Sequence, residues 1–123
     1  MSGAKASEIP KPRWLALDVG GANLKAAHSD GSARSSAFAV WKDPAGLSRA
    51  VADLVSEFAP FDRVAATMTA ELCDCYETKR DGVRSIVQAV GRAIPGRPVL
   101  YWGTDGAFHD EEAVLQNPLT AAA

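Results

Sequence analysis

The stretch that decides the fold of this chain is Asp18-Val19-Gly20-Gly21-Ala22-Asn23-Leu24-Lys25, which directly follows the apolar run 14–17. This order of residues predicts a buried strand that ends at a carboxylate, a tight turn at two glycines, and a returning strand that carries a lysine. Glycines in such a turn permit positive φ and leave room for a phosphate to reach backbone N–H groups. A Gly-Gly pair between apolar runs is equally typical of a plain hairpin without a ligand, so the local sequence leaves both interpretations open.

Apolar periodicity around this stretch predicts three strands, followed by two helices that alternate with two further strands. The expected strands lie over residues 13–19, 22–28, 33–41, 63–68 and 98–103. The first helix is expected to begin at Pro44, with Asp43 as its N-cap, and to end before Pro60. The second carries its apolar face on residues 83–94, and Asp110 is expected to cap a short helix over 111–116.

The element order β-β-β-α-β-α-β predicts an α/β fold with a five-stranded mixed sheet in the order 3-2-1-4-5, whose strands 1, 4 and 5 are parallel. This order places the Gly20-Gly21 turn at the carboxyl ends of strands 1 and 4, where open α/β sheets bind ligands. The glycine patterns of dinucleotide-binding folds and of Walker-type loops do not occur in the sequence.

Length and composition indicate one globular domain in 123 residues. A formal net charge of −2 argues against a nucleic-acid partner, and no apolar run approaches the roughly 20 residues that span a membrane. Residues 1–12 are expected to be a disordered leader and 13–119 the domain. Cys73 and Cys75 are expected to be reduced structural thiols of a cytoplasmic protein, because no second cysteine pair completes a zinc pattern.

The segment 18–25, within this order of elements, resembles the first phosphate loop of the actin-like ATPase superfamily, whose lobes have a ribonuclease H-like fold. The hydantoinase/oxoprolinase family resembles the chain most, through its Asp-x-Gly-Gly-Thr/Ala loop and a Thr-rich segment after the fourth strand, here 67–82. The wording of 68–74 and 79–83 is more similar still to the branch linked to tetrahydromethanopterin-dependent C1 transfer. Characterised members of that branch couple an aminomethylfuran diphosphate to glutamyl-tyramine in methanofuran biosynthesis. The resemblance covers about residues 14–119.

This resemblance implies a site for a small phosphorylated ligand, either ATP or a diphosphate substrate, together with Mg²⁺ or a similar divalent metal. Asp18 is implied as the metal-binding carboxylate. Gly20, Gly21 and Ala22 are implied as backbone donors to the phosphate, with the side chains of Asn23 and Lys25 facing it.

The same resemblance implies that the chain is the N-terminal lobe of a two-lobed enzyme, truncated before the second lobe and inactive alone. The partner would be a second lobe of the same or a separate chain. The implied base for a phenol nucleophile is Glu71 or Asp74, which follow the fourth strand beside Thr67 and Thr69. The plain alternative is that this segment only caps and links the neighbouring elements.

Two other functions remain open from the sequence. One is the lobe of an ATP-dependent amide hydrolase or small-molecule kinase, which Ala22-Asn23 disfavours because kinase-like relatives carry Thr or Ser there. The other is a non-catalytic module that pairs with a separate second lobe and exposes an apolar face near residues 101, 102, 108 and 115. Trp41 and Trp102 are expected in the core or at a lobe interface, and Gly103–Gly106 is expected to be a turn.

Overall fold

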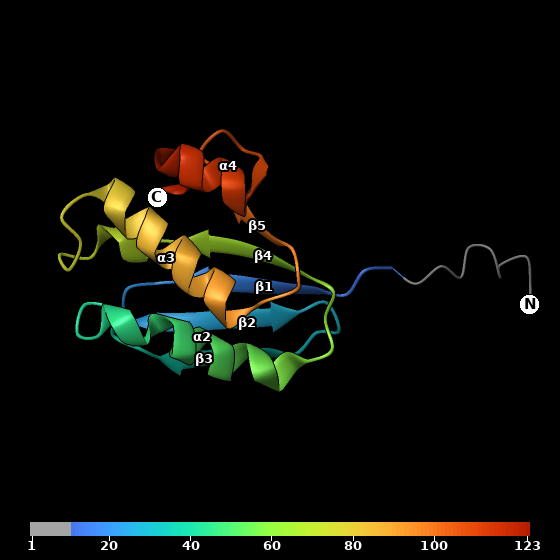
Figure 1. Ribbon diagram of the computed structural model, residues 1–123. Helices are drawn as coiled ribbons and strands as arrows, with labels where there is room; N and C mark the ends of the chain where they lie inside the picture. Colours follow the sequence, from blue (N-terminus) through green and yellow to red (C-terminus); the bar gives the residue numbers. More distant parts are fainter. Residues whose placement is uncertain (1–10) are drawn as a thin grey trace, which may run out of the picture.

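A mixed sheet of six strands organises residues 11–123, the part of the chain that the computed structural model describes (Figure 1). The spatial order is β3-β2-β1-β4-β5-β6, in which β1, β4 and β5 are mutually parallel and the other neighbours are antiparallel. The strands are β1 (Trp14–Val19), β2 (Asn23–His28), β3 (Ala33–Ala37), β4 (Arg63–Met68), β5 (Val99–Trp102) and β6 (Phe108–Asp110). The expected leader, residues 1–12, lies outside the described residues except for its last two.

The α/β class and the order of the first five strands are confirmed, and the sheet has one strand more than expected. β6 was not predicted from the sequence, because a strand of three residues is too short to show an alternating apolar pattern. The third strand also ends four residues earlier than expected. After β3, the N–H groups of Phe38 and Val40 donate to the carbonyls of Ala22 and Gly21, each at 3.0 Å. These two hydrogen bonds hold residues 38–40 against the β1–β2 turn.

The predicted caps Asp43 and Asp110 are confirmed, and Thr78 is a further cap that was not predicted. Asp43 accepts from the N–H of Gly46 and starts a continuous helical segment, and Thr78 and Asp110 cap α3 and α4 through the N–H groups of Asp81 and Ala113. In chain order the segments are η1 (Pro44–Gly46), α2 (Leu47–Val55), η2 (Ser56–Phe58), η3 (Ala70–Leu72), α3 (Lys79–Ala93), α4 (Glu111–Gln116) and η4 (Pro118–Ala121). None of the described helices is long and apolar enough to cross a membrane.

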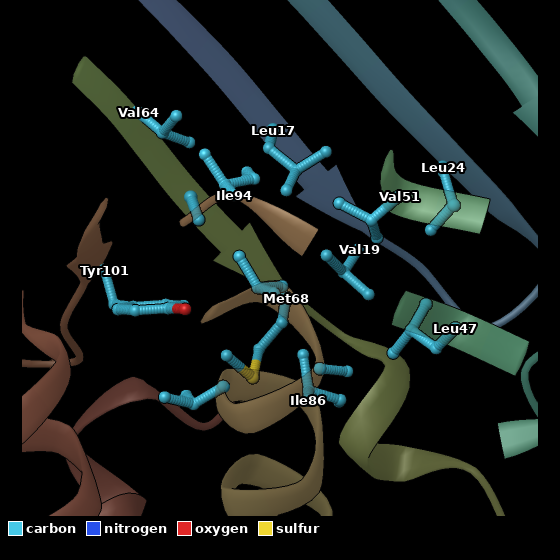
Figure 2. Packing of buried hydrophobic residues seen from close by; sticks show 14 of the residues in the cluster. Leu17, Val19, Leu24, Leu47, Val51, Val64, Met68, Ile86, Ile94 and Tyr101 are labelled. Atoms are coloured by element: carbon cyan, nitrogen blue, oxygen red, sulfur yellow. The ribbon is translucent and has the colours of Figure 1, made fainter. Parts of the chain in front are cut away.

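The core lies between the sheet and the helices α2 and α3, which run across one face of it (Figure 1). Every second strand residue points into this layer, and the apolar stripes of the two helices fill it from the other side. Figure 2 shows the packing of Leu17 and Met68 from the sheet with Val51 of α2 and Ile86 of α3. All four are at most 3% exposed.

The opposite face of the sheet has no helix against it among residues 11–123. Burial alternates along β1 and β2, so that Leu15 and Leu24 are buried while Ala16 and Lys25 are exposed. The register then fixes which residues share this open face, and it places Asp18 between Lys25 of β2 and Thr67 of β4. The open face therefore carries Asp18, expected to bind a metal ion, and Lys25, expected to face the phosphate.

An ion pair joins Arg13, the residue before β1, to Asp62, the residue before β4. The Arg13 backbone N–H donates to Asp62 Oδ2 at 2.7 Å, and its guanidinium donates to both carboxylate oxygens at 3.2 Å. Hydrogen bonds from the Arg13 side chain and backbone, in that order, lower the Asp62 pKa from 3.8 to about 2. Because the folded-state pKa is lowered, the pair stabilises the fold above the ordinary pKa and loses this effect as the pH falls toward about 2.

We expect Arg13→Met to raise the Asp62 pKa toward its ordinary value of 3.8. Carboxyl-carbon NMR titration of both proteins measures this directly, and Arg49→Met, which removes an exposed arginine elsewhere, serves as the control. An Asp62 pKa that stays near 2 in Arg13→Met contradicts the assigned cause.

Candidate functional site

The turn between β1 and β2 presents two backbone donors at the carboxyl end of β1. The N–H of Gly20 donates to the carbonyl of Asn23 at 3.0 Å and closes the turn. Within residues 11–123, the N–H groups of Gly21 and Ala22 have no hydrogen-bond acceptor. Consecutive backbone N–H groups in a turn are a common means of binding an anion.

Glycine is needed in this turn for space, because neither Gly20 nor Gly21 adopts the positive φ that glycine permits. Among the glycines of residues 11–123, positive φ occurs at Gly31, Gly96 and Gly106. A β-carbon at Gly20 would lie 2.9 Å from the Asn23 carbonyl oxygen, whereas one at Gly21 would meet nothing within 4 Å. Gly20 therefore allows the tight closure, and the space beside Gly21 is open to a ligand.

A polar row crosses the open face of the sheet one step before this turn. Asp18 pairs with Lys25 across β1 and β2 and with Thr67 across β1 and β4, while Lys25 pairs with Ser35 of β3. Side chains at such positions stand about 5 Å apart on one face. No ion pair forms between Asp18 and Lys25 in the described structure, so both charged groups are available to a ligand.

This row borders an open hollow of about 720 Å³. The floor of the hollow is made of alanine methyl groups from four adjacent strands, namely Ala33, Ala27, Ala16 and Ala65. Trp102 and Phe108 border it from β5 and β6, with ring centroids 5.1 Å apart in an edge-to-face arrangement. The hollow is therefore apolar, with charged and hydroxyl groups along one side.

The segment after β4 meets the β1–β2 turn through Thr69. The N–H of Thr69 donates to the Val19 carbonyl at 3.0 Å, and a β-carbon at Gly20 would lie 3.8 Å from Thr69 Oγ1. The structure thus brings Asp18, the turn and Thr69 to one edge of the sheet, as the sequence predicted for the carboxyl ends of β1 and β4.

Glu71 does not join this group. Its side chain is 2% exposed, packs against Gly82 of α3, and accepts from the backbone N–H of Ala123 at 2.5 Å through Oε2. Its Oε1 is buried without a partner among the described atoms. Asp74 is exposed in the loop before α3 and does not line the hollow. The assignment of a base to Glu71 or Asp74 stays a prediction.

The two cysteines lie in the same loop as free thiols whose sulfur atoms are 2.6 Å apart. Burial is the main cause, and the hydrogen bond with Cys73 the next, of a rise in the Cys75 pKa to about 11. Cys75 is therefore protonated at neutral pH, which suits a structural thiol. In the part of the chain that is described, no three His, Cys, Asp or Glu side chains gather as a metal site.

Because no such cluster includes Asp18 in the described residues, its carboxylate would be the one protein ligand of this kind for a metal ion. Mg²⁺ is commonly held by one or two carboxylates together with substrate phosphates and waters. One carboxylate beside two free N–H groups and a lysine fits a cation that arrives with a phosphorylated ligand. It does not fit a cation bound by the protein alone.

For Trp41 and Trp102 the structure excludes the expected place in the core, while the expected place at a lobe interface stays a prediction. Trp41 and Trp102 are 57% and 47% exposed, so neither is a core residue. Tyr101, expected on an exposed face, is buried, and that burial raises its pKa. The signal available in the sequence was the alternation of strand side chains: if Tyr101 points inward, Trp102 must point to the open face. Gly103–Gly106 forms the β5–β6 turn as expected, and Asp105 there contacts His109 at 2.9 Å.

The fold defines the class of protein. The sheet order β3-β2-β1-β4-β5-β6, with a meander first and helical crossovers afterwards, is that of a ribonuclease H-like lobe of the actin-like type. No family model matches the chain.

Comparison with curated proteins finds a particular relative in Methanocaldococcus jannaschii. It is (4-{4-[2-(gamma-L-glutamylamino)ethyl]phenoxymethyl}furan-2-yl)methanamine synthase, 35% identical over 113 residues. The match covers 89% of this chain and 33% of the synthase. The chain is therefore a distant homologue of part of that enzyme and spans about a third of its length.

Proposed function

We propose that this chain is the phosphate- and metal-binding lobe of an enzyme that joins a furanylmethyl group to a phenol with loss of diphosphate. The reaction would belong to the biosynthesis of methanofuran-type carriers of one-carbon units. The observation that carries the proposal is that two free backbone donors, at Gly21 and Ala22, lie in the turn that follows the Asp18–Lys25 pair at the carboxyl end of β1. The homology to the synthase supports the choice of reaction.

The chemistry of such a coupling makes the diphosphate the group that the protein must stabilise. The bond between the furanylmethyl carbon and the diphosphate oxygen breaks, and the phenol oxygen forms the new ether bond to that carbon. The phenolic proton passes to a base; of the two residues expected for this role, Asp74 is exposed and is the one proposed, since Glu71 is buried against Ala123. The name of the relative contains this type of ether, a phenoxymethyl group on a furan.

The residues of the turn and the polar row would act on the departing diphosphate. Its negative charge grows as the carbon–oxygen bond breaks, so donors that are already in place favour the transition state. The N–H groups of Gly21 and Ala22 would bind the phosphate oxygens, Asn23 would face them, and the Lys25 ammonium would offset their charge. Asp18 would hold Mg²⁺, which supplies further neutralisation of phosphate charge when it is bound.

The remaining two thirds of the relative's length would supply the rest of the active site, in the same or a separate chain. We therefore assign to this chain alone the binding of the diphosphate and the metal, and we assign turnover to the complete enzyme. The rival use of ATP is separable, because an ATP-dependent enzyme converts ATP to ADP whereas the proposed coupling releases inorganic diphosphate only.

We expect inorganic diphosphate with Mg²⁺ to shift the amide NMR signals of Gly21 and Ala22 in the isolated chain. Lys25→Met is expected to weaken this binding about tenfold, or about 1.4 kcal/mol, because the variant lacks the cation of the polar row. Lys11→Met removes an exposed lysine that precedes β1, at the opposite end of this strand from the turn, and is the matched control.

Two outcomes contradict the proposal. One is the absence of shifts at Gly21 and Ala22 up to millimolar diphosphate. The other is equal loss of affinity in Lys25→Met and Lys11→Met, which would show a general charge effect. ADP formation by the complete enzyme during turnover would favour the kinase or amide hydrolase alternative.

A further inference from the structure

We infer that Cys73 and Cys75 are a redox-active pair, which forms an internal disulfide by exchange with a low-molecular-weight disulfide. The pair lies in the loop between η3 and α3, and both residues are half-buried free thiols. In the reduced chain they pack as the structural thiols described above. The inference adds a site of covalent modification, and it holds whichever ligand the β1–β2 turn binds.

A β-turn brings the two sulfur atoms together. The N–H of Tyr76 donates to the carbonyl of Cys73 at 3.3 Å, which makes Asp74 and Cys75 the central residues of the turn. Within it, the Cys75 N–H donates to Cys73 Sγ at 3.3 Å, and the two Sγ atoms are 2.6 Å apart. A disulfide bond is about 2.05 Å long, so a small movement of the two side chains is enough to form it.

Contacts on both sides hold this turn in place. Before it, the N–H of Cys73 donates to the carbonyl of Ala70 at 3.0 Å, within η3. After it, the Tyr76 ring packs against α3, where a β-carbon at Gly82 would lie 3.0 Å from the ring. Because the turn is fixed, each thiol has a high effective concentration toward the other. The internal disulfide is therefore favoured over mixed disulfides with the small molecule.

A metal site is another common use of two close cysteines, and the surroundings do not favour it. Structural zinc is held by four ligands, which are mostly cysteine and histidine side chains. In residues 11–123, no third His, Cys, Asp or Glu side chain gathers with this pair. Each thiol therefore has the other as its partner, which is the arrangement that disulfide exchange requires.

The exchange proceeds in two balanced steps. Burial raises the pKa of Cys75 to about 11, so Cys75 is a thiol at neutral pH and the first attack falls to Cys73. The Cys73 thiolate attacks one sulfur of the small disulfide, forms a mixed disulfide and releases a small thiolate. Cys75 then gives its proton to a small thiolate and attacks the Cys73 sulfur, which releases the second. Both cysteines are oxidised, and one small disulfide is reduced to two small thiols that carry the protons of the two cysteines.

The new bond also acts on the residue between the two cysteines. Asp74 is exposed in the reduced chain, and its backbone becomes part of the ring that the disulfide closes. We therefore expect the amide NMR signal of Asp74 to move on oxidation and to return on reduction. The redox state of the pair thus sets the backbone of Asp74, the residue proposed above as the base.

The test is thiol exchange of the full chain with bis(2-hydroxyethyl) disulfide, a neutral probe, followed by alkylation of the remaining thiols and mass spectrometry. We expect the alkylated cysteines to fall from two to none. The internal disulfide is expected to exceed the mixed disulfide at least about tenfold. Cys75→Ser is the matched variant. Because it lacks the second thiol, the mixed disulfide at Cys73 is expected to accumulate in it.

The contribution of the fold is measured by repeating the equilibrium in urea. A mixture of the probe and its thiol, 2-mercaptoethanol, gives the effective concentration of one cysteine toward the other. We expect this concentration to be at least about fivefold higher in the folded chain than in the unfolded chain, because urea removes the turn that pairs the two sulfur atoms.

Three results overturn the inference. The first is that both cysteines remain alkylated after equilibration with an excess of the probe. The second is accumulation of mixed disulfides, or of disulfide-linked dimers of the chain, in place of the internal bond. The third is an effective concentration in the folded chain that is no higher than in urea. None of these measurements involves diphosphate, so failure of this inference and failure of the proposed function are distinguishable.

Discussion

Ile86→Ala is expected to lower the free energy of unfolding by about 3–4 kcal/mol. Ile86 is fully buried on α3, in the layer between the helices and the sheet where Figure 2 shows it with Met68 of β4. Removing three carbon atoms there forfeits their transfer from water and leaves a cavity that the strands and helices around it cannot close. Urea denaturation followed by circular dichroism measures the difference.

Gln88→Ala is the control for this prediction. Gln88 is exposed on the same helix, so the change leaves the core intact and is expected to alter stability by no more than about 0.5 kcal/mol. A loss below about 1 kcal/mol in Ile86→Ala would show that the layer between α3 and the sheet is not tightly packed in solution.

Gly82→Ala is the second substitution with a large expected effect, a loss of about 2 kcal/mol. A β-carbon at Gly82 would lie 2.9 Å from Cβ and 3.0 Å from Cα of Glu71, and 3.0 Å from the Tyr76 ring. Glu71 is buried in η3, so its backbone has little freedom to move away. The crowding outweighs the gain of about 1 kcal/mol that alanine brings to a helix interior.

Gly91→Ala provides a matched comparison within α3. A β-carbon there would meet chiefly the carboxylate end of Glu111, an exposed side chain that can move aside. The same substitution is therefore expected to raise stability by up to about 1 kcal/mol. Thermal unfolding of the two variants should shift in opposite directions. A destabilisation of equal size in both would contradict the close contact between α3 and η3.

The parts of the structure that sequence reasoning predicted well share a local cause. Asp43 and Asp110 cap helices through their own neighbours, and the stripe from Val83 to Ile94 repeats with the helical period. The order of strands followed from the right-handed crossover rule applied to these elements. Each of these inferences needs only residues close together in the chain, or a rule on how elements connect.

The candidate site was predicted in part for the same reason. Asp18 and Lys25 share a face because a tight turn joins their strands, and the turn itself is visible as Gly20-Gly21. Thr69 reaches that turn because β1 and β4 are parallel neighbours. Glu71 lies only two residues further, yet its side chain turns into the interior against Gly82 and Ala123. No local pattern marks that change of direction.

The sequence by itself determined the elements, their caps, their order in the sheet and the position of the glycine turn at the end of β1. These depend on local periodicity, on turn chemistry and on the handedness of crossovers, all of which are written along the chain. The tertiary structure decided which face of the sheet the helices cover. It thereby exposed Trp102 and Phe108 beside the alanine floor and buried Tyr101 and Glu71. Such outcomes depend on contacts between residues far apart in the chain, which become defined only when the strands pair and the helices pack on them.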